Sequence, residues 1–258
     1  MNKLFLLSII CFLCGVNKTN AQLGFGHEIG VIAGPVMFMS DYGIRGELET
    51  NLGNTGFGAG IIHYINFSYD AGCNCYREKT FFNDHFKLRS EISYNRTNLQ
   101  HFGRWAEKDN VAGRQLAAMR GTASNLNLGM QLEFYPLSIR EFEETIGKFG
   151  PFASLGFQYT RYSPQASSLL GPIGLPETTW VKYQNAFTNQ AGNVWSVVGS
   201  LGTRYKLTTM SDLLLDLRWQ YYFSDWVDGL RPDPRFYNEN KANDWLVWLN
   251  FGYIYYID

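Results

Sequence analysis

The sequence predicts an all-β fold: an eight-stranded antiparallel up-and-down transmembrane β-barrel whose lumen is filled by side chains. Three observations support this prediction. Apolar and polar residues alternate with a period of two over eight segments, and the chain begins with an export signal. Each segment is also close to the ~9–11 residues that a tilted strand needs to cross a bilayer. An even strand count with an apolar outer face is typical of outer-membrane barrels.

Composition excludes several other classes of protein. The chain has 258 residues, 45% of them hydrophobic, and contains 19 Phe, 16 Tyr and 7 Trp. This much apolar surface excludes an intrinsically disordered chain. The only long apolar run, residues 4–16, is shorter than the roughly 20 residues of a spanning helix. A net charge of −1 argues against a nucleic-acid partner.

Residues 1–21 are predicted to be a secretory signal peptide that is cleaved after Ala21. Lys3 supplies the positive start, residues 4–15 the apolar core, and Ala21 the small residue at the cleavage site. Residues 22–258 are then a single barrel domain in the outer membrane of a Gram-negative cell. Outer-membrane lipid surrounds it, and both termini are expected in the periplasm.

The strands are expected in chain order as follows. Segments 27–37 and 56–68 are glycine-rich and alternate less cleanly. The clearest strand is 86–97, where Phe86, Leu88 and Tyr94 share one face and Lys87 and Arg89 the other. Segments 123–135, 195–206, 212–223 and 245–257 alternate in the same way, and 150–161 completes the set. A soluble β-sandwich also alternates, but charges in strand centres and large apolar residues on every strand favour the barrel.

The connections indicate which way the barrel faces. The loops 38–55, 98–122, 162–194 and 224–244 are longer than the turns 69–85, 136–149 and 207–211, as expected for an outward and a periplasmic set. Within the second turn, residues 137–146 fit either a short amphipathic helix or a solvated charged turn.

The polar face of the strands is expected to fill the lumen, because an eight-stranded barrel is just wide enough for its side chains. Unpaired charges in so narrow a space would be costly, so we expect a network of ion pairs rather than a conducting pore. The predicted lumen charge network comprises Glu28, Lys87, Arg89, Glu91, Glu133, Arg204, Asp216 and Arg218.

No enzyme signature is evident, so we expect no catalytic activity, no cofactor and no metal. His63 with Ser68 or Asp70 is the one conceivable catalytic group. The glycines of segment 56–60 lack the spacing and the strand–turn–helix context of a phosphate-binding loop. They are expected instead to make room for bulky inward neighbours such as Arg89, or to let the sheet bend.

The turn 69–85 contains the two cysteines of the mature chain, Cys73 and Cys75. An exported protein permits a disulfide between them. A metal site with His85 is the alternative, although zinc sites prefer cysteines separated by two to four residues. Apolar residues in the periplasmic turns are candidate contacts for a protein partner. They are Phe81, Phe82, Phe142 and Ile146.

The first two strands resemble the PorG-like outer-membrane proteins of Bacteroidota. The resemblance is carried by HEIGVIAG at 27–34, SDY at 40–42, GAG at 58–60 and HYINF at 63–67. It implies a small barrel of the type IX secretion and gliding-motility apparatus. Its periplasmic partners would be a ring built from a lipoprotein and a second protein, and it implies no catalytic motif.

Three hypotheses for the function therefore remain. The first is a barrel that anchors or docks a periplasmic protein-secretion or motility complex. The second is a stand-alone structural or adhesive barrel that acts through the outer loops 163–194 and 225–244. The third is a lipid-modifying enzyme that depends on His63.

Overall fold

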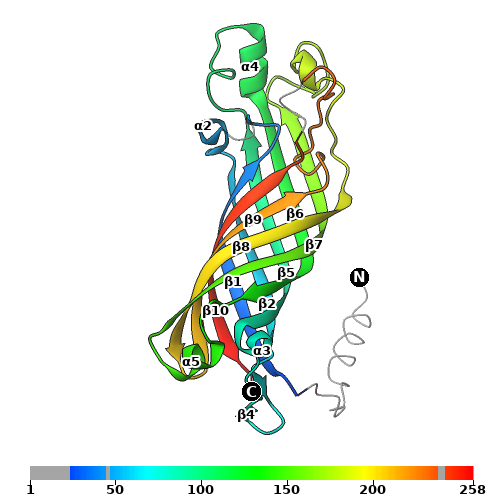
Figure 1. The fold of residues 1–258 in the computed structure, drawn as a ribbon. Coiled ribbons are helices and arrows are strands. Elements are labelled where there is room, and N and C mark those ends of the chain that lie inside the picture. The colour runs from blue at the N-terminus through cyan, green and yellow to red at the C-terminus, as the bar shows by residue number, and fades with distance from the viewer. Residues whose placement is uncertain (1–23, 45–46, 238–241, 258) are drawn as a thin grey trace, which may run out of the picture.

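The computed structural model describes residues 24–44, 47–237 and 242–257. Eight strands form one closed antiparallel barrel in the order β1-β2-β5-β6-β7-β8-β9-β10, and β10 pairs with β1 to close it (Figure 1). The predicted fold class is therefore confirmed. The predicted signal peptide, residues 1–21, lies outside the described residues. No helix in the described part of the chain is long and apolar enough to cross a bilayer.

All eight predicted strands are present. Their bounds are β1 Gly26–Met39, β2 Thr55–Asn66, β5 Phe86–Gln100, β6 Met119–Phe134, β7 Phe149–Ser168, β8 Gly192–Thr208, β9 Ser211–Tyr222 and β10 Trp245–Tyr256. The largest difference is at β7, which was predicted to end at residue 161. Its additional residues pair with β6, but outward positions such as Ser163 and Gln165 are polar. Hydrogen-bonded pairing between β6 and β7 therefore continues past residue 161, although the outward residues there are no longer apolar.

Short elements occupy the connections at both ends of the barrel. One end, here called the loop end, is formed by the connections that follow β1, β5, β7 and β9. It carries α2 Leu48–Asn51, α4 Val111–Ala118 and η1 Val181–Tyr183. The terminal end, where the described chain begins and ends, carries β3 Tyr69–Asp70, β4 Cys75–Tyr76, α3 Phe81–His85 and α5 Ile139–Glu144 (Figure 1). Of the two alternatives for residues 137–146, the structure has the helix, capped by the hydroxyl of Ser138.

The two faces of the sheet differ in chemistry because successive side chains point to opposite sides. Outward residues such as Leu128, Leu155 and Phe157 are exposed on the barrel wall, whereas their strand neighbours Asn127 and Gln158 are buried in the lumen. A closed sheet also leaves no unpaired strand edge. The barrel therefore combines an apolar outer wall with a polar interior.

Candidate functional site

The lumen near the terminal end holds a cluster of ion pairs. The ammonium of Lys87 lies 2.5 Å from Glu28 Oε1 and 2.7 Å from Glu143 Oε1. Arg204 contacts the second oxygen of Glu28 and lies 2.7 Å from Asp212 Oδ2. These side chains come from β1, β5, β8, β9 and α5, so the cluster joins strands on opposite sides of the barrel.

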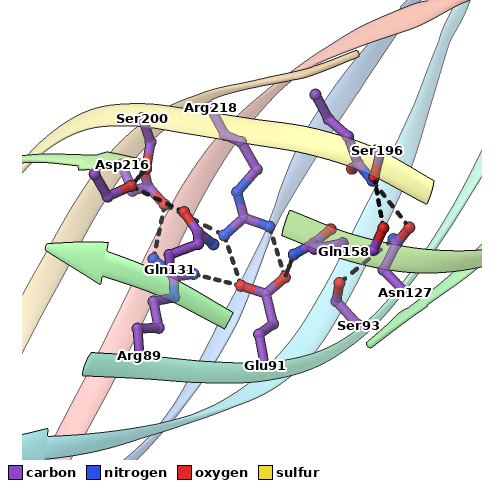
Figure 2. A network of polar contacts seen from close by, with 12 residues as sticks. Arg89, Glu91, Ser93, Asn127, Gln131, Gln158, Ser196, Ser200, Asp216 and Arg218 are labelled. Atoms are coloured by element: carbon purple, nitrogen blue, oxygen red, sulfur yellow. Dashed lines mark hydrogen bonds and ion pairs between the residues drawn. The ribbon is translucent and has the colours of Figure 1, made fainter. Parts of the chain in front are cut away.

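A second cluster lies deeper in the lumen, around Glu91 and Asp216 in the middle parts of β5 and β9. Figure 2 shows its contacts from close by. Arg218 donates two hydrogen bonds to Glu91, at 2.6 Å and 2.7 Å, and Arg89 Nη2 donates to the same carboxylate at 2.8 Å. Arg89 Nη1 lies 3.1 Å from Asp216 Oδ2 and 3.4 Å from Glu133 Oε1. Glu91 is therefore shared by two guanidinium groups.

Tyrosines connect the two clusters. The hydroxyls of Tyr64 and Tyr135 donate to Glu133 at 3.1 Å and 2.7 Å. Arg204 Nη1 in turn donates to the Tyr135 hydroxyl at 3.4 Å. Buried charges are tolerated when their partners satisfy them, and here the pairing is continuous from the terminal mouth to the centre.

Beyond the ion pairs, towards the loop end, the lumen becomes neutral and then apolar. The side-chain amide of Gln220 donates to Asn127, Thr160 and Ser196. Further along, aromatic and aliphatic side chains close the barrel. These residues include Trp248, Phe38, Tyr222, Ile32 and Leu246.

Gly58 of β2 makes room for the indole of Trp248, because a Cβ at this position would lie 2.5 Å from Trp248 Cζ2. A bulky inward neighbour is therefore present at this glycine as expected, but it is Trp248 and not Arg89. The bulky neighbour comes from β10, on the other side of β1, and no pattern within segment 56–60 identifies it.

All eight residues of the predicted lumen charge network are buried inside the barrel, and the structure joins them in the network described above. Three members were missed: Lys206, Asp212 and Glu143. Lys206 lies two residues after Arg204, and Asp212 lies four residues before Asp216. Residues an even number apart on a strand share a face, so this rule, strand parity, could have placed both inside. Glu143 enters the lumen from α5, and no strand pattern signals this.

The terminal end is a platform made of α3, α5 and the β3–β4 hairpin. The carboxylate of Asp84 in α3 accepts from the hydroxyl of Ser138 at 2.9 Å and pairs with Lys79 at 3.2 Å. Arg140 of α5 donates to the carbonyl of Arg77, beside the hairpin, at 2.7 Å. These bonds hold the three elements together.

Glu143 ties this platform to the barrel. Its Oε1 accepts from Asn66 at 2.7 Å as well as from Lys87. Burial raises the pKa of the Glu143 carboxyl, and the nearby Lys87 ammonium opposes that shift. Movement of α5 would therefore disturb the lumen network directly.

Cys73 and Cys75 form a disulfide at the tip of the hairpin. Their sulfurs are therefore not metal ligands in this state, and His85 instead contacts the carbonyl of Tyr135 through Nδ1. Among the described residues, no group of three or more His, Cys, Asp or Glu side chains is arranged to hold a metal ion.

The proposed partner contacts fall into three groups. Phe142 is 3% exposed and packs against Gly150, so its assignment as a surface contact is wrong: α5 turns this side chain inward. Ile146 is exposed. Phe81 and Phe82 are exposed too, but they belong to an outward phenylalanine band at the terminal end. The band comprises Phe25, Phe67, Phe81, Phe82, Phe86 and Phe134.

The conceivable catalytic group around His63 does not assemble. The ring of His63 stacks on that of His27, with Nε2 3.1 Å from His27 Nδ1. The hydroxyl of Ser68 donates to Asn66, and Asp70 pairs with Arg77. The suggested combination of His63 with Ser68 or Asp70 is therefore wrong.

The loop end has a crevice of about 560 Å³ between the connections. The ring of His101 lies between those of Tyr42 and Tyr183, with centroid distances of 5.1 Å and 5.3 Å. Burial, with a smaller contribution from the charge of Lys182, lowers the pKa of His101 to about 3. Trp105 and Trp180 also line the crevice. This aromatic crevice was not identified from the sequence, because its residues come from three different connections.

No protein-family model and no curated protein matches this chain. Among solved structures, it is similar to Neisserial surface protein A, at 15% identity over 89% of this chain and 96% of that chain, with a TM-score of 0.45. It is also similar to the outer membrane protein OprG from Pseudomonas aeruginosa (13% identity, 90% and 97% coverage, TM-score 0.42). A major outer membrane protein from Thermus thermophilus shares 12% identity over 90% and 99% of the two chains, with a TM-score of 0.48.

Proposed function

We propose that the protein is a non-enzymatic, non-conducting barrel of the outer membrane that anchors a periplasmic protein assembly. The membrane placement is supported by the barrel wall, where exposed leucine, phenylalanine and tryptophan side chains cover the strands. The strand carboxylates face inward, among them Glu91, Glu133 and Asp216. Such a distribution suits a barrel surrounded by lipid rather than water.

The observation that carries the proposal is the continuous ion-pair network, which fills the lumen from the terminal end to the centre and includes Glu143 of the platform. Because side chains of the network are fully buried, the lumen offers no path for a solute. The barrel then acts through its ends. Coupling between Glu143 and Lys87 gives the platform a rigid attachment to the membrane-embedded part, which is what an anchor requires.

The assembly that we propose is of the type IX secretion and gliding kind, as the PorG-like resemblance implies, with a lipoprotein ring as the partner. The residues on either side of α5 add two exposed apolar side chains outside the phenylalanine band, Leu137 before the helix and Ile146 after it. Exposed apolar residues in otherwise polar surroundings are typical of the centres of protein interfaces.

The test is affinity purification from the native host after gentle solubilisation, with a tag at the C-terminus. We expect a periplasmic lipoprotein in stoichiometric amount, and its loss from the Leu137→Asp/Ile146→Asp variant. The matched control is Leu169→Asp/Leu170→Asp at the loop end, where both leucines are also exposed. Recovery of the barrel alone from wild type, with crosslinking also negative, would contradict the anchor function.

The crevice at the loop end favours a second candidate, a surface barrel that binds an extracellular ligand through its outer connections. Trp105 and Trp180 present apolar rings there, and Lys182 and Arg104 add positive charge. If the purified barrel lacks periplasmic partners but Trp180→Ala cells lose attachment to a surface that wild-type cells bind, this second function replaces the first.

A further inference from the structure

Charged side chains on the described strands are distributed unevenly between the two faces. Every carboxylate on the eight barrel strands faces the lumen. The Asp, Glu, Lys and Arg residues that face outward on these strands are all arginines. They are Arg96 of β5, Arg120 of β6 and Arg161 of β7. These three strands are neighbours in the barrel and reach the loop end together (Figure 1). The outer wall thus has one cationic patch and no acidic counterpart within the described strands.

Arg96 and Arg161 are the exposed members of this patch. Arg120 is half-buried and donates to the carbonyls of Ala117 and Met119. Within the described chain, the guanidinium groups of Arg96 and Arg161 have neither a carboxylate partner nor a hydrogen bond. On the strand between them, β6, Ser124 pairs with Arg96 and Leu126 pairs with Arg161. The two arginines are therefore offset by two residues along the strands. Strand spacing places their Cα atoms about 12 Å apart, so both side chains can reach one anionic group.

An apolar groove of about 710 Å³ lies on the outer wall beside these arginines. Its floor is Ala33 of β1 paired with Ala59 of β2, and its sides are Phe251 of β10 and Tyr94 of β5. The groove exists because two methyl groups stand between two rings on an otherwise bulky surface. Unfilled, it would forfeit dispersion contacts with its surroundings.

The groove and the arginines are continuous. Tyr94, on one side of the groove, lies two residues before Arg96 on the same outward face of β5. Leu126 also lines the groove and pairs directly with Arg161. A molecule with an anionic head and an apolar tail would therefore satisfy both features at once.

We propose that Arg96 and Arg161 bind the phosphate of a membrane lipid whose acyl chain lies in the Ala33–Ala59 groove. The proposal rests on the membrane placement of the proposed function. Guanidinium groups match phosphate oxygens in geometry and charge. Tyr94 and Tyr159 precede the two arginines by two residues on their strands, and aromatic residues mark the level of lipid headgroups. A second copy of the chain would bring the same cationic patches together, which disfavours a symmetric dimer here.

The test measures lipid binding by native mass spectrometry on the mature full-length barrel in a neutral detergent. The ligands are phosphatidylglycerol and phosphatidylcholine with the same acyl chains. We expect wild type to prefer phosphatidylglycerol, and Arg96→Gln/Arg161→Gln to bind it at least about tenfold more weakly, because charge-assisted hydrogen bonds are lost. Arg114→Gln removes an exposed arginine of α4 and should leave binding unchanged.

A second variant tests the groove. Ala59→Phe fills its floor and should weaken binding of both lipids, whereas sn-glycerol 3-phosphate, which has the headgroup but no acyl chain, should bind neither wild type nor variant measurably. Equal binding of phosphatidylglycerol by wild type and the double arginine variant overturns the proposal. Tight binding of sn-glycerol 3-phosphate would show a free-phosphate site instead of a lipid site.

The two proposals fail separately. Heat-dependent mobility in gels reports whether each variant is a folded barrel, so a variant that does not fold is replaced by Arg96→Ala or Arg161→Ala alone. Loss of the lipid preference with normal partner recovery overturns only the lipid site. Absence of a periplasmic partner with a normal lipid preference overturns only the anchor function.

Discussion

The two halves of the lumen are filled by different chemistry. The half near the terminal end holds five cations and their carboxylates, with buried apolar residues such as Tyr135 and Ile254 packed among them. The half near the loop end holds the neutral side chains around Gln220 and then Trp248, Phe38, Tyr222 and aliphatic residues. In the ionic half, stability depends on each charge keeping its partner. In the apolar half, it depends on filled volume. One barrel thus contains two cores that should respond differently to the same kind of substitution.

The halves also differ in what closes them. Apolar packing at the loop end continues from the lumen into the connections, where Leu116, Tyr183, Val227 and Leu230 belong to the same cluster as Trp248. The ionic half is closed by α5, through the contact between Glu143 and Lys87. The loop end is therefore a hydrophobic cap, and the terminal end is an ion-paired plug.

The largest effect is expected for Glu91→Gln in the ionic half. This substitution leaves the guanidinium groups of Arg89 and Arg218 buried with one carboxylate fewer. Removing one partner of a buried ion pair typically costs about 3–5 kcal/mol. The measurement is the free energy of unfolding by urea of the barrel in lipid vesicles, with tryptophan fluorescence as the signal that reports unfolding.

Glu141→Gln is the matched control, because it removes the same charge from an exposed pair with Lys148. Exposed pairs contribute about 0–1 kcal/mol. The double variant Glu91→Gln/Arg218→Gln should recover part of the loss, since one stranded charge is removed as well. If Glu91→Gln and Glu141→Gln have the same unfolding free energy, the ion pairs do not hold the terminal half together.

A smaller loss is expected for Gly58→Ala, which tests the apolar half by overfilling it. The added methyl group would meet the rigid indole of Trp248 at 2.5 Å, and overpacking typically costs about 1–3 kcal/mol. The same unfolding experiment measures the loss.

Gly199→Ala serves as the control, because a Cβ there meets no atom closer than 3.4 Å. The smaller ring in Gly58→Ala/Trp248→Phe should restore part of the stability. A Gly58→Ala barrel as stable as Gly199→Ala would mean that the apolar half tolerates changes in volume.

The ionic half could be predicted from the sequence further than the apolar half. Strand parity alone places Lys87, Arg89 and Glu91 on the inner face, because the period of a strand is two. The same rule places Lys206 and Asp212 there. Parity does not say which charges meet, since Glu28 of β1 and Arg204 of β8 become neighbours only when the barrel closes.

Contacts made by the connections could not be predicted in this way. Glu143 and Phe142 lie next to each other in a short helix. The docking of that helix buries Phe142 and brings the Glu143 carboxylate to Lys87 in the lumen. The loop-end crevice combines Tyr42, His101 and Tyr183 from three connections without a shared pattern. Likewise, the outward arginines are visible in the sequence, but their grouping beside a groove depends on strand register.

Acid should destabilise the loop end through His101. Burial lowers the pKa of its imidazole from 6.5 to about 3, so between these values the unfolded chain binds a proton that the folded protein does not. Stability is therefore complete above about pH 6.5 and falls as the pH drops toward 3, by at most about 1.4 kcal/mol per pH unit.

The measurement is the unfolding free energy of wild type and His101→Phe at several pH values in this range. The phenyl ring keeps the stack between Tyr42 and Tyr183 but cannot take a proton. We expect a flatter pH dependence for the variant, while Glu141→Gln keeps the wild-type slope. Parallel curves for wild type and His101→Phe would assign the acid sensitivity to other groups.

The smallest effect is expected from the disulfide, which lies outside both halves. Cys73→Ser/Cys75→Ser opens a very short loop, and loop closure of this length contributes at most about 1–2 kcal/mol in the chain-entropy model. Both residues are exposed at the tip of the β3–β4 hairpin. Hydrogen exchange should therefore accelerate at the Asp70–Cys75 pair of the hairpin, while the global unfolding free energy barely changes. Asn74→Gly, which suits the positive φ of 53° at this position, is the control that leaves the bond intact. A loss as large as that of Glu91→Gln would mean that the hairpin is part of the ion-paired plug, because the platform would then transmit its unfolding through Glu143 to Lys87.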